Sequence, residues 1–178
     1  MAQNLSDPAS AGVAVYVAAG SNVSPVDNLV KAIAALRRAF PDLLVSPAFA
    51  NTAAGFKGAD FINLVVGFRT ALPLAAVLAE LHAVEALCGR GRTDAKWAPR
   101  RMDLDVLLYG DLVGEFPGAR LPRPDLATRA YMLGPMAAIA PDVVHPTLHK
   151  SIGELWAAFD QQAHPLRRIS LAPAGARG

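Results

Sequence analysis

Two carboxylates and a group of basic side chains follow one another in the middle of this 178-residue chain. Asp103 and Asp105 occupy a segment typical of a β-strand, where alternate side chains share a face with Cα atoms roughly 7 Å apart. Mg²⁺ takes one or two carboxylates together with phosphate oxygens, and Arg binds phosphates through planar, bidentate donors. The pattern predicts a site for Mg²⁺ and a polyphosphate. The basic residues just before the carboxylates are Arg90, Arg92, Lys96, Arg100 and Arg101.

The same residues have a simpler interpretation. An Asp-x-Asp pair is common, and it could form a solvated face of an edge strand that the basic loop merely neutralises. Trp97 within a polar loop, and the place of the pair at the start of a strand, favour the metal site.

The spacing of these residues resembles the signature of a known enzyme family. Arg90-x-Arg92, followed by Trp97-x-Pro99-Arg100-x-x-Asp103-x-Asp105, is similar to the motif of 6-hydroxymethyl-7,8-dihydropterin pyrophosphokinase, an enzyme of folate biosynthesis. The resemblance extends from about Val13 to about Phe159. Three positions depart from the family pattern: Ala53 replaces a Pro, Ala98 a Gly and Arg123 a His.

The resemblance implies pyrophosphoryl transfer from ATP, the co-substrate, to the hydroxymethyl group of a reduced pterin, with release of AMP. It implies that Asp103 and Asp105 hold two Mg²⁺ ions. The departures leave open a non-catalytic paralogue that binds pterin or nucleotide. The resemblance assigns the catalytic residues as Arg90, Arg100, Asp103 and Asp105, the ATP-binding residues as Glu85, Arg92, Trp97 and Arg129, and the pterin-binding residues as Phe61, Asn63 and Tyr131.

Some of these residues can be interpreted without the family. Phe61 and Asn63 alternate on one face of a predicted strand, where an aromatic ring could stack on a flat heterocycle and an amide could bind its edge. The alternative is a partly exposed Phe and an Asn that bonds a nearby turn. Glu85, one turn before the basic loop, could orient an Arg or meet a nucleotide, or could be a solvated helix residue.

Hydrophobic periodicity predicts strands at 13–19, 43–49 and 61–70, and a fourth strand that carries the two Asp residues. Pro47 interrupts the second of these late, which is typical of an edge strand. Helices are expected from Pro25, with Ser24 as N-cap and Val30 on the apolar stripe, and over 73–88, 128–139 and 151–159. The third of these should be broken near Gly134-Pro135. The order βαββαβ predicts a ferredoxin-like α+β sandwich, an antiparallel sheet flanked by helices, with the first strand beside the third and fourth.

Length and composition indicate how the chain is divided into segments and which classes of protein can be excluded. We expect a flexible segment 1–12, a pyrophosphokinase domain 13–160 and an extended tail 161–178. The net charge of +2 argues against a general nucleic-acid binder. The single Cys88 excludes an internal disulfide, and no signal peptide or membrane-spanning stretch is visible. We therefore expect a cytoplasmic monomer that acts on small molecules, without nucleic-acid or membrane partners.

Overall fold

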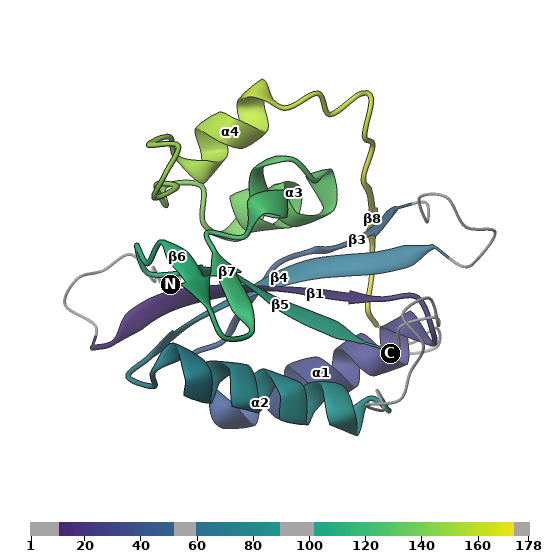
Figure 1. The fold of residues 1–178 in the computed structure, drawn as a ribbon. Coiled ribbons are helices and arrows are strands. Elements are labelled where there is room, and N and C mark those ends of the chain that lie inside the picture. The colour runs from purple at the N-terminus through teal and green to yellow at the C-terminus, as the bar shows by residue number, and fades with distance from the viewer. Residues whose placement is uncertain (1–10, 52–59, 90–101, 173–178) are drawn as a thin grey trace.

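The computed structural model describes residues 11–51, 60–89 and 102–172. Within these ranges an antiparallel sheet lies between two layers of helices (Figure 1). The strands are β1 (Val13–Ser21), β2 (Leu44–Val45), β3 (Ala48–Asn51), β4 (Phe61–Thr70), β5 (Asp103–Tyr109), β6 (Gly114–Phe116), β7 (Ala119–Leu121) and β8 (Arg167–Ile169). The helices are α1 (Pro25–Ala39), α2 (Leu74–Leu87), the 3-10 helix η1 (Pro124–Ala127), α3 (Ala130–Ile139) and α4 (Ile152–Ala158).

The main sheet has the strand order β5-β1-β4-β3-β8, and β2 also pairs with β4. All of these pairs are antiparallel, so the predicted antiparallel sheet and the central position of β1 between β4 and β5 are confirmed. Strand β8 comes from the segment expected to be an extended tail and pairs with β3. A separate hairpin of β6 and β7 follows β5.

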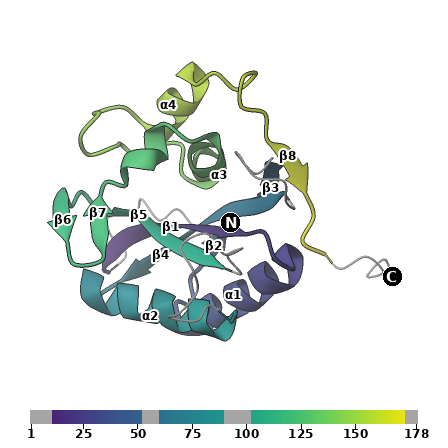
Figure 2. The ribbon, with the colours of Figure 1, turned by 45° about the vertical axis from the view of Figure 1, so that its right-hand side comes forward.

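Helices α1 and α2 cover one face of the sheet, while α3 and α4 lie over the other (Figures 1 and 2). The first face carries the larger core, including the predicted stripe of β4: Ile62, Leu64, Val66 and Phe68. Phe68 is fully buried and stacks on Phe40, with ring centroids 3.8 Å apart. The second face packs Tyr16, Ala18 and Val65 against α3. Among the described residues, this second core includes Leu107 and Leu108 of β5 but not the start of that strand, where Asp103 lies.

The predicted interruption of strand 43–49 at Pro47 is confirmed, since β2 ends before it and β3 begins after it; proline has no N–H for a ladder. Three other local expectations need correction. Ser24 is the N-cap residue of α1, as predicted, but its backbone is left-handed and its side chain does not make the expected cap hydrogen bond. Val30 is 47% exposed, so it lies outside the buried stripe of α1.

The third correction concerns α3, which continues through Pro135 instead of breaking there. Met132, Leu133 and Met136 are buried in the second core, and this packing stabilises the helix despite the missing N–H. A Cβ on Gly134 would lie 2.7 Å from Leu166 Cδ1 and 3.1 Å from the Trp156 ring, so glycine permits the close approach of the following segments.

His145 gives the fold a pH-dependent stability. Its Nδ1 accepts N–H bonds from Thr147 and Leu148 at 3.3 and 3.2 Å. Burial, aided by the charge of His149, lowers the pKa of His145 below its ordinary value of 6.5. A lowered pKa means that the neutral ring is favoured in the folded state, so its stabilisation is complete above the unfolded pKa and is lost as pH falls through the folded pKa.

We therefore expect the melting temperature to fall as pH is lowered from about 7 to about 5, and to fall less in His145→Asn. The Asn carbonyl can accept the same N–H bonds but does not titrate. The matched control is His164→Asn at an exposed position. Equal pH slopes for His145→Asn and the wild type would show that another group carries the effect.

Candidate active site

The two acidic side chains lie on the same face of β5. Leu104 between them is buried in the core beneath α1 and α2, while Asp103 and Asp105 are partly exposed on the opposite face. Strand β5 pairs with β1, where Gly20 stands opposite Asp103 and Ala18 opposite Asp105. The alternation predicted from the sequence is therefore present.

The register of β1 decides what else shares this face. Gly20 stands opposite Asp103 on one side and opposite Asn63 of β4 on the other. Residues directly opposite in an antiparallel ladder point to the same face. Phe61, two residues before Asn63, points there as well. The structure thus brings the amide and the aromatic ring onto the face of the two carboxylates, an arrangement that periodicity alone left open.

Gly20 leaves room for the Asn63 side chain. A Cβ on Gly20 would lie 2.6 Å from Asn63 Oδ1, far inside van der Waals contact. Asn63 is buried and its Nδ2 donates to Oδ1 of Asn51 at the end of β3. The amide is therefore held over Gly20 by a bond to a neighbouring strand rather than to a turn.

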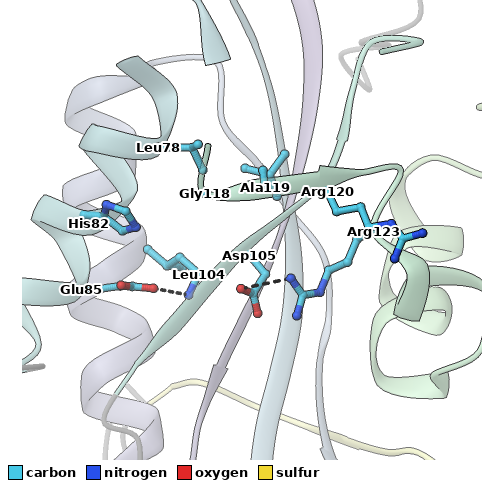
Figure 3. Close-up of a pocket in the computed structure, with 10 residues that line it drawn as sticks. Leu78, His82, Glu85, Leu104, Asp105, Gly118, Ala119, Arg120 and Arg123 are labelled. Carbon is cyan, nitrogen blue, oxygen red and sulfur yellow. Dashed lines mark hydrogen bonds and ion pairs between the residues drawn. The ribbon is translucent and has the colours of Figure 1, made fainter. Parts of the chain in front are cut away.

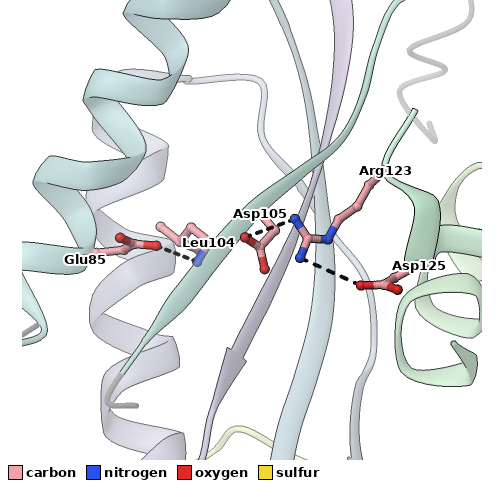
Figure 4. Close-up of polar contacts among 5 residues, drawn as sticks. All are labelled: Glu85, Leu104, Asp105, Arg123 and Asp125. Atoms are coloured by element: carbon pink, nitrogen blue, oxygen red, sulfur yellow. Dashed lines mark hydrogen bonds and ion pairs between the residues drawn. The ribbon is translucent and has the colours of Figure 1, made fainter. Parts of the chain in front are cut away.

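Glu85 is buried, only 7% exposed, so the solvated interpretation is wrong. It lies in the last turn of α2, and its Oε1 accepts the backbone N–H of Leu104 at 2.9 Å (Figure 4). Strand β5 is the edge of the sheet on this side. The carboxylate thus satisfies a donor of the edge strand between the two Asp residues and fixes β5 to α2.

Replacement of Glu85 by Ala is expected to reduce the free energy of unfolding by about 1–3 kcal/mol, because the Leu104 N–H loses its acceptor in a buried place. Glu85→Gln keeps an acceptor and should retain most of the stability. Urea denaturation measures the difference, with Glu80→Ala on the exposed side of α2 as the control. A Glu85→Ala variant as stable as the control would contradict this role.

Arg123 reaches the candidate metal site. One guanidinium nitrogen lies 3.4 Å from Asp105 Oδ1 and the other lies 3.8 Å from Asp125 Oδ2 (Figure 4). The backbone N–H of Arg123 donates to Leu107 O at 2.9 Å, which attaches this segment to β5. Arg123 therefore points toward Asp105 and Asp125 rather than away into solvent.

Tyr131 and Arg129 belong to the start of α3, close to this cluster. Burial raises the pKa of the Tyr131 hydroxyl, while the nearby Arg129 charge lowers it. Asp125 and Asp105 raise that pKa and Arg123 lowers it, so Tyr131 lies within the electric field of all four charged groups. Arg129 is exposed at the N-terminus of the helix.

A pocket of about 150 Å³ opens beside the outer edge of β5 (Figure 3). Its walls come from α2, β5, the β6–β7 hairpin and Arg123. Gly118 turns the hairpin with a φ of 84°, a left-handed conformation that favours glycine. A Cβ there would lie 3.3 Å from Leu78 Cδ1, so the turn rests against α2 and closes one side of the pocket. Glu85 and Asp105 both line it.

The predicted site residues Arg90, Arg92, Trp97 and Arg100, and the departures Ala53 and Ala98, lie outside the described residues. Sequence reasoning missed Gly20, Asn51 and Asp125. Gly20 directly follows the predicted strand 13–19, and its place between Asn63 and Asp103 depends on strand register. Asn51 and Asp125 sit in loop-like sequence without a motif of their own.

Together these observations define a class: an α+β protein whose antiparallel sheet carries two carboxylates, an amide and an aromatic ring on one face, beside an arginine and a pocket. A comparison with family models matches residues 16–141 to 7,8-dihydro-6-hydroxymethylpterin-pyrophosphokinase. The chain belongs to this family.

Relatives and solved structures agree with this assignment. A 2-amino-4-hydroxy-6-hydroxymethyldihydropteridine pyrophosphokinase of Aquifex aeolicus is 33% identical over 142 residues, covering 79% of this chain and 88% of the relative. The enzyme of the same name from Pseudomonas aeruginosa is 37% identical, covering 74% and 83%. The HPPK-DHPS of Plasmodium falciparum superposes with a TM-score of 0.62 at 10% identity, which shows a shared fold. That alignment covers 85% of this chain but only 45% of the longer Plasmodium chain.

Proposed function

We propose that this protein transfers the pyrophosphoryl group of ATP to the hydroxymethyl group of 6-hydroxymethyl-7,8-dihydropterin, releasing AMP, in folate biosynthesis. The observation that carries the proposal is the row of Asn63, Gly20 and Asp103 across three neighbouring strands. This row supports the proposal because an amide, which can bind a heterocycle, shares a face with carboxylates, which can bind a metal–phosphate complex. Family membership and the names of the relatives support the same reaction.

The carboxylate oxygens on this face are suitable ligands for Mg²⁺. Asp103 and Asp105 are partly exposed oxygen ligands on one face, and in the described ranges no group of three or more His, Cys, Asp or Glu side chains forms a closed metal cage. Mg²⁺ is normally bound by one or two carboxylates, with water and substrate phosphates completing its octahedron. We propose that Asp103 and Asp105 hold two ions, which would neutralise phosphate charge and lower the pKa of the attacking hydroxyl.

The pterin would lie on the face around Gly20. Phe61 and Tyr131 would stack on its ring, and Asn63 would bind its edge through groups not used by Asn51. Tyr131 supports this placement because it lies at the same cluster as Asp105. The amide, held by Asn51, would meet the ring with little loss of side-chain entropy on binding.

ATP would enter through the pocket beside β5. Because the Leu104 N–H points to this outer edge, the backbone groups of Val106, two residues on, point there too and could bind the base. Glu85 would fix this edge. We propose that Arg129 and Arg123 contact the phosphates, with Arg90, Arg92 and Arg100, while Trp97 covers the bound nucleotide.

This arrangement aligns two reactants. The pterin hydroxymethyl oxygen would attack the β-phosphorus as the bond from that phosphorus to the oxygen bridging the α-phosphate breaks. AMP would leave with the bridging oxygen, and the hydroxyl proton would pass to water. Transfer of this kind depends on positioning and charge stabilisation rather than on a covalent enzyme intermediate. The arginines would stabilise the negative charge that develops on the transferred group and on AMP.

The test is to incubate the protein with ATP, Mg²⁺ and 6-hydroxymethyl-7,8-dihydropterin and to measure AMP formation by chromatography. Reactions that lack the pterin serve as controls. We expect AMP and pterin pyrophosphate in equal amounts. Binding of both substrates without AMP would identify a non-catalytic paralogue.

The finer organisation is part of the proposal. The order β5-β1-β4-β3, with α1 and α2 on one face, supports a ferredoxin-like βαββαβ core for the pyrophosphokinase domain 13–160. Among the described residues, no helix is long and apolar enough to cross a membrane. A cytoplasmic monomer stays our prediction, which fractionation and light scattering would test.

A further inference from the structure

Arg123 makes an ion pair with a residue that the proposed reaction needs for metal. Its guanidinium spans Asp105, at 3.4 Å, and Asp125, at 3.8 Å. Asp105 belongs to β5, whereas Asp125 belongs to η1 on the other side of the guanidinium (Figure 4). A positive charge therefore already lies beside one of the two candidate metal ligands.

This ion pair is loose. Close charge-assisted N–H···O bonds measure about 2.7–2.9 Å, and both distances here are longer. The side chains of Arg123 and Asp105 are 34% and 37% exposed, so solvent screens their attraction. Within the described residues the buried Nε of Arg123 has no hydrogen-bond partner. The guanidinium is therefore near Asp105 without having its hydrogen-bonding capacity used there.

The backbone of Arg123 is fixed by hydrogen bonds at both its N–H and its carbonyl oxygen. The residue stands between Pro122 and Pro124, and its N–H is bonded to Leu107 O at 2.9 Å. Its carbonyl oxygen accepts the N–H of Leu126 at 3.1 Å. Any change of partner must come from rotation of the long side chain about a fixed origin beside Asp105 and the pocket.

We propose that Arg123 is an exchange residue: it contacts Asp105 when no metal is bound, and it transfers to the nucleotide phosphates when the metal–nucleotide complex enters. The inference rests on the proposed function, because it takes Asp105 as a metal ligand. A divalent cation alone must displace a like charge from Asp105. A cation that arrives bound to a polyphosphate also brings anionic oxygens. These oxygens accept hydrogen bonds from the guanidinium of Arg123 as that side chain leaves Asp105. Metal and nucleotide binding are consequently coupled, and the protein selects the complex over the free ion.

The test uses Mn²⁺ as a probe, with affinity read by electron paramagnetic resonance of the free ion, and the non-transferable α,β-methylene analogue of ATP, with affinity read by calorimetry. In Arg123→Gln, Mn²⁺ alone should bind about tenfold more tightly, a coupling of ordinary size. The metal–nucleotide analogue should bind about tenfold more weakly, because a charge-assisted contact is lost. A residue with a purely structural role would not change the two affinities in opposite directions.

Three further variants complete the design. Arg38→Gln removes an equal charge from an exposed position on α1, on the opposite side of the sheet, and should change neither affinity. Arg123→Lys keeps the charge without the fork, so Mn²⁺ binding should stay close to wild type while nucleotide binding weakens. The double variant Asp105→Asn/Arg123→Gln should lack the tighter Mn²⁺ binding that is expected of Arg123→Gln alone. Circular dichroism verifies the fold of each variant.

The outcomes separate the inference from the proposed function. If Asp105→Asn binds Mn²⁺ and the analogue as the wild type does, the metal site, and the proposed function with it, is wrong. If Asp105→Asn weakens metal binding but Arg123→Gln leaves Mn²⁺ affinity unchanged or lower, the exchange is overturned while the metal site stands.

Discussion

Asp103→Asn and Asp105→Asn are each expected to lower kcat by about a hundredfold or more, since several kcal/mol of transition-state charge stabilisation would be lost with metal binding. Neither change should unfold the protein. Both side chains are partly exposed on the face away from the larger core, and Asn has nearly the same shape as Asp. The measurement is AMP formation at saturating substrates and Mg²⁺, together with a thermal melt.

The matched control is Asp111→Asn, an exposed carboxylate in the turn just after β5. It carries the same charge change a few residues from the site and should behave as the wild type. Near-normal turnover of either site variant at saturating Mg²⁺ would restore the interpretation of the pair as a solvated strand face.

Gly20→Val is expected to lower kcat/KM for the pterin by about a hundredfold, because misplacement of a reactant by about 1 Å can have an effect of this size. A Cβ at position 20 would lie 2.6 Å from Asn63 Oδ1, and the branched methyl groups would extend over the face toward Asp103. Displacement of the buried Asn63 amide would break its hydrogen bond to Asn51, so a stability cost of about 1–3 kcal/mol is expected and a thermal melt should accompany the assay. Valine itself is favoured in strands.

A double-mutant cycle shows whether Gly20 acts through Asn63. Gly20→Ala and Asn63→Ala should each weaken pterin binding, by about 1–3 kcal/mol for the amide. The double variant should lose little more than the worse single variant, because both changes remove the same contact. Additive losses would mean that Gly20 affects the site by another route.

The sequence by itself determined the main helices and strands, and the residues whose side chains could take part in chemistry. The alternating apolar residues of β4 predict its bounds and its buried face, since a strand between two layers must place alternate side chains in each. The same two-residue period places Asp103 and Asp105 on one face of β5. The motif around them, read from side-chain types and spacing, predicts the family to which the chain belongs.

Only the tertiary structure decided which of these residues meet. Asn63 and Asp103 are separated by forty positions, and a shift of one residue in either ladder would turn them to opposite faces; long-range pairing sets the register that aligns both with Gly20. The partners of Glu85 and Arg123 were equally hidden, because each lies on a different element and is reached by a long side chain. Such contacts depend on how α2, β5 and η1 pack together, and local periodicity contains no information about the distance between elements.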